Sequence, residues 1–285
     1  MTSRTYLLTA LAMLAFAGNS LLCRAALRDT TIDPATFTAL RLFAGAGVLW
    51  LIVRMRAKTT APAGSWRGAL ALFAYAAAFS YAYVQLDAGA GALLLFGAVQ
   101  LSMIGWGLLS GERLMAMQIG GMLLAAAGVV ALLLPGASAP PLVASLLMVV
   151  SGVAWGAYSL MGKGRPNPLA TTAGNFARGA PIAAALCVAA MARLDWDSTG
   201  ALYALASGAL TSGIGYAIWY AALPGLSAVQ GASVQLSVPL ITALAGSLLL
   251  GESLTGRIVL AGLAILGGIA LVLLPLQRTR GVTTR

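Results

Sequence analysis

The tetrapeptide Val99-Gln100-Leu101-Ser102 occurs a second time as Val234-Gln235-Leu236-Ser237, and a Tyr-Ala pair lies 18 residues before each copy. Downstream, the copies reach the chain's only two glutamates, in Gly111-Glu112 and Gly251-Glu252. Each glutamate lies 23 residues before a proline that follows Leu-Leu, although the second copy carries five extra residues before its Gly-Glu pair. Self-similarity at a fixed period is interpreted before local structure. A single period of about half the chain predicts a two-fold duplication.

The composition is that of a membrane protein. Of the 285 residues, 60% are hydrophobic and 8% are charged, whereas soluble domains contain about 25% charged residues. There are 17 basic and 7 acidic residues. A basic excess can indicate nucleic-acid binding, but here it lies mostly in short loops and tails, the positive-inside pattern of a polytopic membrane protein. Cys23 and Cys187 are isolated, so we expect no disulfide framework and no metal site. We also expect no cofactor, and the placement of the basic residues in loops and tails predicts no nucleic-acid partner.

Ten segments are long and apolar enough to span a bilayer as helices, so the expected fold is all-α. Arg4, the apolar run after it and Ala15-Phe16-Ala17 resemble a signal peptide. We reject that interpretation because segment 142–161, with Lys163 after it, matches the first segment and would otherwise lack a counterpart. The expected segments are 5–23, 34–53, 68–86, 90–110, 116–134, 142–161, 169–192, 199–222, 226–250 and 257–276.

The basic residues also predict the orientation in the membrane. A cytoplasmic N-terminus leaves four basic residues outside, Arg24, Arg28, Arg193 and Arg257. Eleven then lie inside: Arg4, Arg54, Arg56, Lys58, Arg67, Arg113, Lys163, Arg165, Arg278, Arg280 and Arg285. We therefore expect both termini in the cytoplasm.

Five segments per half is an odd number, so the second copy enters the bilayer from the opposite side. This arrangement is a 5+5 inverted repeat, a transporter design whose substrate site lies at the midplane between the halves. The expected domains are a first repeat over residues 1–137, a second over 138–277 and a cytoplasmic tail over 278–285.

Charged groups are scarce within the segments. Asp87, Glu112 and Glu252 lie near segment ends, and the chain has no histidine. Proton-coupled carriers usually hold a carboxylate or histidine inside the bilayer, so the sequence favours an uncoupled facilitator and disfavours an antiporter of cationic drugs. Arg41 and Arg178 do lie inside segments. Each either snorkels toward a helix end, or meets a substrate carboxylate in a cavity.

Aromatic side chains suggest a cavity wall. Tyr75, Phe79 and Tyr83 lie at i, i+4 and i+8, on one helical stripe. Trp and Tyr also form interfacial belts, which explains Trp66 and Trp196 beside the segments. That explanation fits mid-segment aromatics less well, so they either belong to the belts or line a cavity. The other candidates for cavity-lining aromatics are Phe96, Trp155, Tyr158, Tyr216 and Trp219.

The repeat-matched Gln100 and Gln235 either join helices or provide hydrogen bonds in a cavity, because an unpaired amide in hydrocarbon is costly. Pro239 can bend its helix and is the expected hinge. Glycines in segments 116–134 and 257–276 allow close helix packing. These two segments could instead form a dimer contact, so we expect a monomer or a weak homodimer.

Arg41, Val238-Pro239, Leu249-Leu250-Gly251-Glu252 and the glycine-rich last segment ending in Leu-Leu-Pro together resemble the ten-helix, EamA-domain branch of the drug/metabolite transporter superfamily. The resemblance covers nearly the whole chain. Ile104 stands where the second copy has Pro239, which puts a bend of the fourth segment in doubt. Within the superfamily the chain looks like inner-membrane exporters of aromatic amino acids. The resemblance implies ten helices around a central cavity lined by helices 1, 3, 4, 6, 8 and 9.

The sequence therefore predicts a bacterial inner-membrane transporter that exports small metabolites, chiefly aromatic and other neutral amino acids, by alternating access. Its expected partners are that small-molecule substrate and the lipid bilayer. The substrate-binding prediction comprises Tyr75, Phe79, Tyr83, Phe96, Gln100, Trp155, Tyr158, Tyr216, Trp219 and Gln235. A drug or other metabolite carrier of the same fold, with or without proton coupling, is the alternative. An intramembrane enzyme would need a catalytic cluster that this sequence lacks.

Overall fold

A computed structural model describes residues 2–56, 63–136 and 139–278, and these residues contain helices and no strand. The helices of the first half are α1 (Ser3–Asp29), α2 (Pro34–Arg56), α3 (Trp66–Tyr83), α4 (Ala88–Leu109) and α5 (Ala116–Leu133). Those of the second half are α6 (Leu142–Gly162), α7 (Pro168–Ala189), η1 (Met191–Arg193), α8 (Ser198–Ala206), η2 (Ser207–Ile214), α9 (Gly215–Ala222), η3 (Leu223–Gly225), α10 (Ala228–Gln235), α11 (Ser237–Leu250) and α12 (Gly256–Arg278).

Eight helical stretches in the described part are long and apolar enough to cross a membrane. They are α1, α2, α4, α5, α6, the continuous run Ser198–Gly225, the stretch Gln230–Leu250 and α12 up to Leu273. Large apolar side chains are exposed on the outside of the molecule; Phe43 is 51% exposed, Leu123 60% and Leu263 67%. A soluble monomer rarely exposes this much apolar surface. The chain is a polytopic, all-helical membrane protein.

Local sequence signals explain where several helices begin and end. Asp33 caps α2, since its carboxylate accepts hydrogen bonds from the backbone N–H groups of residues 35 and 36. Ser65 caps α3 and Asn167 caps α7, where Pro168 fills the first helical position. The expected end of the first segment at residue 23 was wrong. Helix α1 runs to Asp29 because no breaker intervenes before Asp33-Pro34.

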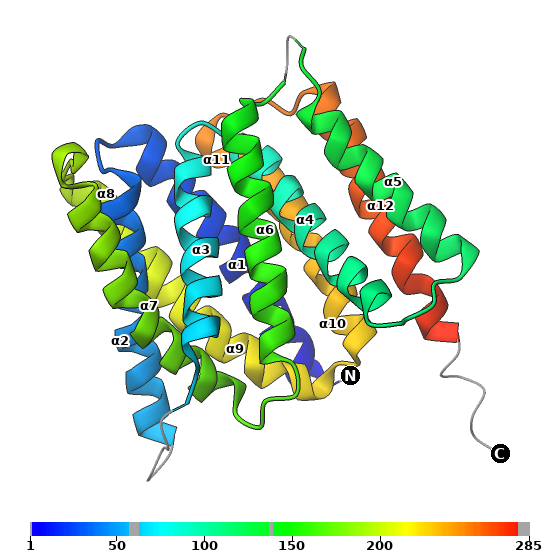
Figure 1. The fold of residues 1–285 in the computed structure, drawn as a ribbon, viewed down its shortest axis with the longest axis horizontal. Coiled ribbons are helices and arrows are strands. Elements are labelled where there is room, and N and C mark those ends of the chain that lie inside the picture. Colours follow the sequence, from blue (N-terminus) through cyan, green and yellow to red (C-terminus); the bar gives the residue numbers. More distant parts are fainter. Residues whose placement is uncertain (1, 57–62, 137–138, 279–285) are drawn as a thin grey trace.

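Figure 1 shows α1 in the middle of the molecule, behind α3 and α6, with α5 and α12 paired at one edge. Helix α1 begins and α12 ends at the same end of the molecule. Glycines explain the α5–α12 pairing: a Cβ on Gly121 would lie 2.5 Å from the carbonyl oxygen of Gly268, and the reverse holds for Gly268. These glycines are a packing face within the chain, as the sequence allowed.

Two helical stretches in the second half are irregular. Between α8 and α9 the helix widens to a π-helix, η2, where Gly208 packs directly against the backbone of Arg41. The stretch α10–α11 breaks at Leu236, two residues after the start of the repeated tetrapeptide, and Pro239 lies in the first turn of α11. Helix α4, the first-half counterpart, has Ile104 at the matching position and continues unbroken.

Candidate functional site

A main cavity of about 530 Å³ lies between α1, α3, α4, α6, α7, α9 and α10. Its walls combine apolar and polar groups from both halves of the chain. Its mouth is formed by loop residues at the end where α1 begins (Figure 1). Gly64 and Ser65 contribute from the α2–α3 connection, and Lys163, Gly164 and Arg165 contribute from the exposed α6–α7 loop. The cavity therefore opens at that end.

Trp155 is at the centre of the aromatic wall. Its ring stacks on Tyr158 at a centroid distance of 5.3 Å and on Tyr216 at 5.6 Å, and it contacts Tyr75 at 4.8 Å. Phe16 of α1 lies edge-on to Trp219, with centroids 6.0 Å apart. Stacked and edge-on pairs are the favourable aromatic geometries. Five of these six rings line the main cavity, those of Phe16, Trp155, Tyr158, Tyr216 and Trp219.

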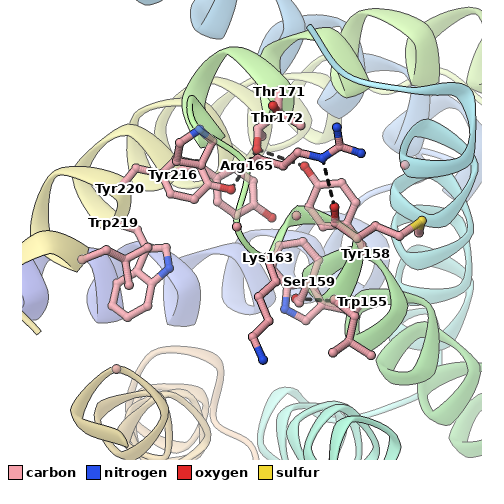
Figure 2. Close-up of a pocket in the computed structure, with 18 of the residues that line it drawn as sticks. Trp155, Tyr158, Ser159, Lys163, Arg165, Thr171, Thr172, Tyr216, Trp219 and Tyr220 are labelled. Atoms are coloured by element: carbon pink, nitrogen blue, oxygen red, sulfur yellow. Dashed lines mark hydrogen bonds between the residues drawn. The ribbon is translucent and has the colours of Figure 1, made fainter. Parts of the chain in front are cut away.

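Hydrogen bonds between side-chain hydroxyl groups connect the helices that form this wall. Thr172 accepts a hydrogen bond from Tyr158 at 3.0 Å and shares a second with Tyr220 at 2.8 Å, as Figure 2 shows. The three residues come from α6, α7 and α9, so this network fixes three helices around the cavity. Lys163 and Arg165 extend from the loop beside it (Figure 2).

A small cavity of about 30 Å³ adjoins the main one and shares Phe16, Trp155, Tyr216 and Gln235 with it. Its other lining residues are Asn19, Tyr75, Phe79, Leu95, Phe96, Thr211 and Ser212. It lies deeper in the molecule, because Asn19, Tyr75, Phe79 and Ser212 are all buried. A volume of this size exceeds the minimum that admits a water molecule.

Nine of the ten predicted site residues line at least one of the two cavities. Tyr83 lines neither: it is fully buried, it packs edge-on to Phe79, and its hydroxyl donates to the carbonyl of Ala88. Gln100 and Gln235, the repeat-matched pair, both line the main cavity. Pro239 lies outside both cavities.

Several lining residues were missed by the sequence analysis. Phe16 has no partner in the repeat, and Thr172 is one of two adjacent threonines in α7 with no distinguishing signal. Lys163 and Arg165 were counted only as loop charges. Tyr220 and Ser212 lie inside the expected segment 199–222, where a mid-segment aromatic and a mid-segment polar residue are both cavity signals, but neither belongs to the ten predicted substrate-binding residues.

The other end of the molecule is closed by an ionic cluster, which we call the closed-end cluster: Arg24, Arg28, Asp87 and Glu252. Arg24 Nε donates to Glu252 at 2.9 Å, and its Nη2 donates to Asp87 at 3.2 Å. Nη1 of the same guanidinium donates to the carbonyls of residues 83 and 84. The second Glu252 oxygen accepts the backbone N–H of Ala88 at 2.8 Å. One arginine on α1 therefore joins the α3–α4 turn to the α11–α12 turn.

The two Gly-Glu pairs form similar turns in different environments. Gly111 (φ 90°) and Gly251 (φ 65°) both have the left-handed conformation that ends a helix, and the N–H of each following glutamate bonds a glycine carbonyl in the last helical turn. The side chain of Glu252 is only 6% exposed within the closed-end cluster. Glu112 is exposed and forms no ion pair with any described residue.

The chain has clear relatives. Residues 142–274 match the EamA-like transporter family. The protein PA1977 of Pseudomonas aeruginosa, named only as uncharacterized, is 63% identical over 273 residues, which cover 95% of both chains. An "uncharacterized transporter" from Archaeoglobus fulgidus is 27% identical over 95% of this chain and 98% of its own.

A solved crystal structure has the same fold. It superimposes with a TM-score of 0.69 over 98% of this chain and 99% of its own, at 20% sequence identity. The chain thus belongs to the same family as the Pseudomonas protein, and its second half is an EamA-like transporter family domain.

Proposed function

We propose that this protein is a membrane transporter that exports small metabolites, chiefly aromatic and other neutral amino acids, by alternating access. The observation that carries the proposal is the main cavity: about 530 Å³, walled by aromatic rings, open at one end and separated from the other by the closed-end cluster. Cavities that enclose small organic molecules occupy about 300–1,000 Å³.

The proposed topology has ten spans: the eight apolar stretches above together with α3 and α7. Both additional helices pack beside spans, α3 against α6 and α7 against α2. Their polar residues, such as Thr172 and Asn175 of α7, lower their hydropathy, and these two residues line the main cavity rather than face lipid. Ten spans in two sets of five make the proposed inverted repeat, with domains 1–137 and 138–277.

The proposed orientation puts both termini in the cytoplasm of a bacterial inner membrane, following the excess of basic residues at that end. The main cavity then faces the cytoplasm, and the structure corresponds to an inward-open state. Export requires a second state in which the closed-end cluster separates and the mouth near Lys163 and Arg165 closes. The break at Leu236 and Pro239 supplies the proposed hinge.

Aromatic and neutral amino acids fit the wall chemistry best. Rings such as Trp155 and Tyr216 favour another ring in stacked or edge-on contact. Gln100, Gln235 and Asn175 offer uncharged hydrogen-bonding groups to the polar end of the guest. The seven acidic residues all lie in the described part of the chain, and none lines either cavity, which supports uncoupled transport.

The test is efflux of labelled phenylalanine from proteoliposomes containing the full-length protein, without an ion gradient and then with imposed pH gradients. We expect saturable flux down the phenylalanine gradient alone. Trp155→Ala should raise the half-saturating concentration by about 2- to 12-fold, the factor that corresponds to removal of one aromatic pair between guest and wall. Trp196→Ala, at an exposed position in the α7–α8 connection, is the matched control and should leave flux unchanged.

Two other outcomes would contradict parts of the proposal. Flux that requires a proton gradient would overturn uncoupled transport and implicate Asp87, Glu112 or Glu252. Absence of flux for any amino acid would refute the substrate class and leave a carrier of drugs or other metabolites.

A further inference from the structure

Arg41 of α2 is deeply buried, which the snorkelling interpretation did not anticipate. Its side chain is 1% exposed and is among the largest fully buried side chains of the described chain. An arginine that snorkels keeps its charged head in water or among lipid headgroups. The guanidinium of Arg41 has no such access, so its charge must be balanced inside the protein or by a bound molecule.

The described chain does not supply that balance. None of the seven acidic side chains, all of them in the described ranges, forms an ion pair with Arg41. Within those ranges, the arginines that do form ion pairs are Arg24 and Arg28, at the closed end. A buried cation without a counter-ion is strongly destabilising, because desolvation is not repaid.

The hydrogen bonds of Arg41 are also incomplete. Nη2 donates to the Tyr75 hydroxyl at 3.0 Å, and Nε makes a long contact of 3.4 Å with the Ser212 hydroxyl. The rings of Tyr75 and Phe79 lie 5.2 and 5.1 Å from the guanidinium carbon, within cation–π range. Nη1 is buried and has no hydrogen-bond partner among the described residues.

The three residues that contact the guanidinium, Tyr75, Phe79 and Ser212, all line the small cavity. The Tyr75 hydroxyl already accepts hydrogen bonds from Arg41 and from Asn19, so its own proton remains available to donate. The Ser212 hydroxyl likewise accepts from Arg41 and can donate. The site is therefore rich in donors and positively charged, which matches an anion and disfavours a cation.

Arg178, the second arginine within a helix, provides the contrast. Its Nη1 donates to two backbone carbonyls, those of Ala63 at 2.7 Å and Gly174 at 2.9 Å. Neither arginine is among the residues that line the two cavities, but the three residues that contact Arg41 line the small cavity, whereas Ala63 and Gly174 line neither. Carbonyl oxygens satisfy this guanidinium, so Arg178 has a structural explanation that Arg41 lacks.

We propose that Arg41, Tyr75 and Ser212 form an anion subsite at the inner end of the main cavity, where the cargo's carboxylate binds while its apolar part stacks on the Trp155 wall. The proposal rests on the proposed transport function and names the chemical group that every good substrate shares. The four residues shared by the two cavities connect the subsite to the wall. A guest bound in this way neutralises the buried charge as it fills the cavity.

The experiment measures binding to the purified full-length protein, by quenching of tryptophan fluorescence, for two matched pairs. These are L-phenylalanine against L-phenylalaninamide, and 3-phenylpropionate against 3-phenylpropionamide. We expect each acid to bind about 10- to 150-fold more tightly than its amide, the factor for one hydrogen bond to a charged group. Arg41→Gln should abolish the preference, whereas Arg178→Gln, the control, should retain it.

A second variant keeps the test informative if Arg41→Gln does not fold. Ser212→Asp introduces a carboxylate beside Arg41, so it should raise thermal stability and abolish the preference for acids. Equal binding of acid and amide to the wild type, or a preference that survives either Arg41→Gln or Ser212→Asp, would overturn the subsite. An Arg41-dependent preference for phenylpropionate without any amino-acid flux would instead refute the proposed amino-acid function and leave the subsite standing.

Discussion

Neutralising Glu252 should open the closed end of the molecule. Glu252 accepts from Arg24 Nε at 2.9 Å and from the backbone N–H of Ala88 at 2.8 Å, with only 6% of its side chain exposed. Breaking a buried ion pair outright costs about 3–5 kcal/mol. Glu252→Gln should cost less, because Arg24 keeps Asp87 and two carbonyls and the glutamine oxygen still accepts one bond. We expect about 1.5–3 kcal/mol, the value for a hydrogen bond to a charged group.

This cost falls on the closed state alone, so the equilibrium with the open state should shift by about 10- to 150-fold. A state populated at about 1% would rise to about 10–60%. Spin labels at Val84→Cys and Ser253→Cys, with both native cysteines replaced by serine, report the separation of the α3–α4 and α11–α12 turns. In double electron–electron resonance, Glu252→Gln should add a longer distance to the wild-type distribution.

The control for this prediction is Glu112→Gln, which alters the repeat-matched but exposed glutamate and should leave the distances unchanged. An unaltered distribution in Glu252→Gln would refute the reasoning that the ionic cluster holds this end closed. Lengthening in both variants would point to a general loss of stability instead.

Three further predictions concern packing and the hinge. Gly268→Ala should destabilise the protein by about 1–3 kcal/mol, because its Cβ would lie 2.5 Å from the Gly121 carbonyl oxygen. The control is Gly267→Ala, whose Cβ would have open space, so it should be neutral or stabilising. Thermal unfolding in detergent compares the two variants. Thr172→Val should lower stability by about 1–3 kcal/mol because it leaves two tyrosine hydroxyls without their partner, and an unchanged melting temperature would contradict this. Pro239→Ala should slow transport with little change in substrate affinity, and kinetic measurements in proteoliposomes would separate the two effects.

Helical periodicity, mid-segment aromatic residues and the repeat-matched glutamines pointed to nine residues that line the two cavities, but these signals carry no information on depth. Tyr75, Phe79 and Tyr83 share one stripe, and only the first two reach a cavity. Tyr83 lies one turn nearer the closed end, where α4 covers it. Where a cavity stops along a helix depends on which helices converge there, and no local pattern records that.

Arg41 shows a similar limit. Its position two turns from the start of α2 was compatible with snorkelling, because sequence distance to the helix end was the only available measure. The actual environment depends on η2, whose Gly208 allows the π-helix to pack directly against the backbone of Arg41. The burial of the guanidinium thus depends on a segment about 170 residues away, and no feature of α2 itself could have predicted it.

Helix α1 connects the main cavity with the closed-end cluster. Phe16 lies in the cavity wall, Asn19 donates to the Tyr75 hydroxyl, and Arg24 holds the ionic cluster. The eight residues from Phe16 to Arg24 span about 12 Å of helix axis. A guest that tilts α1 by about 10° around Phe16 would therefore displace Arg24 by about 2 Å, enough to break a hydrogen bond with a normal length near 2.9 Å. In the proposed transport cycle, occupancy of the cavity and integrity of the closed-end cluster would then be coupled through a single helix.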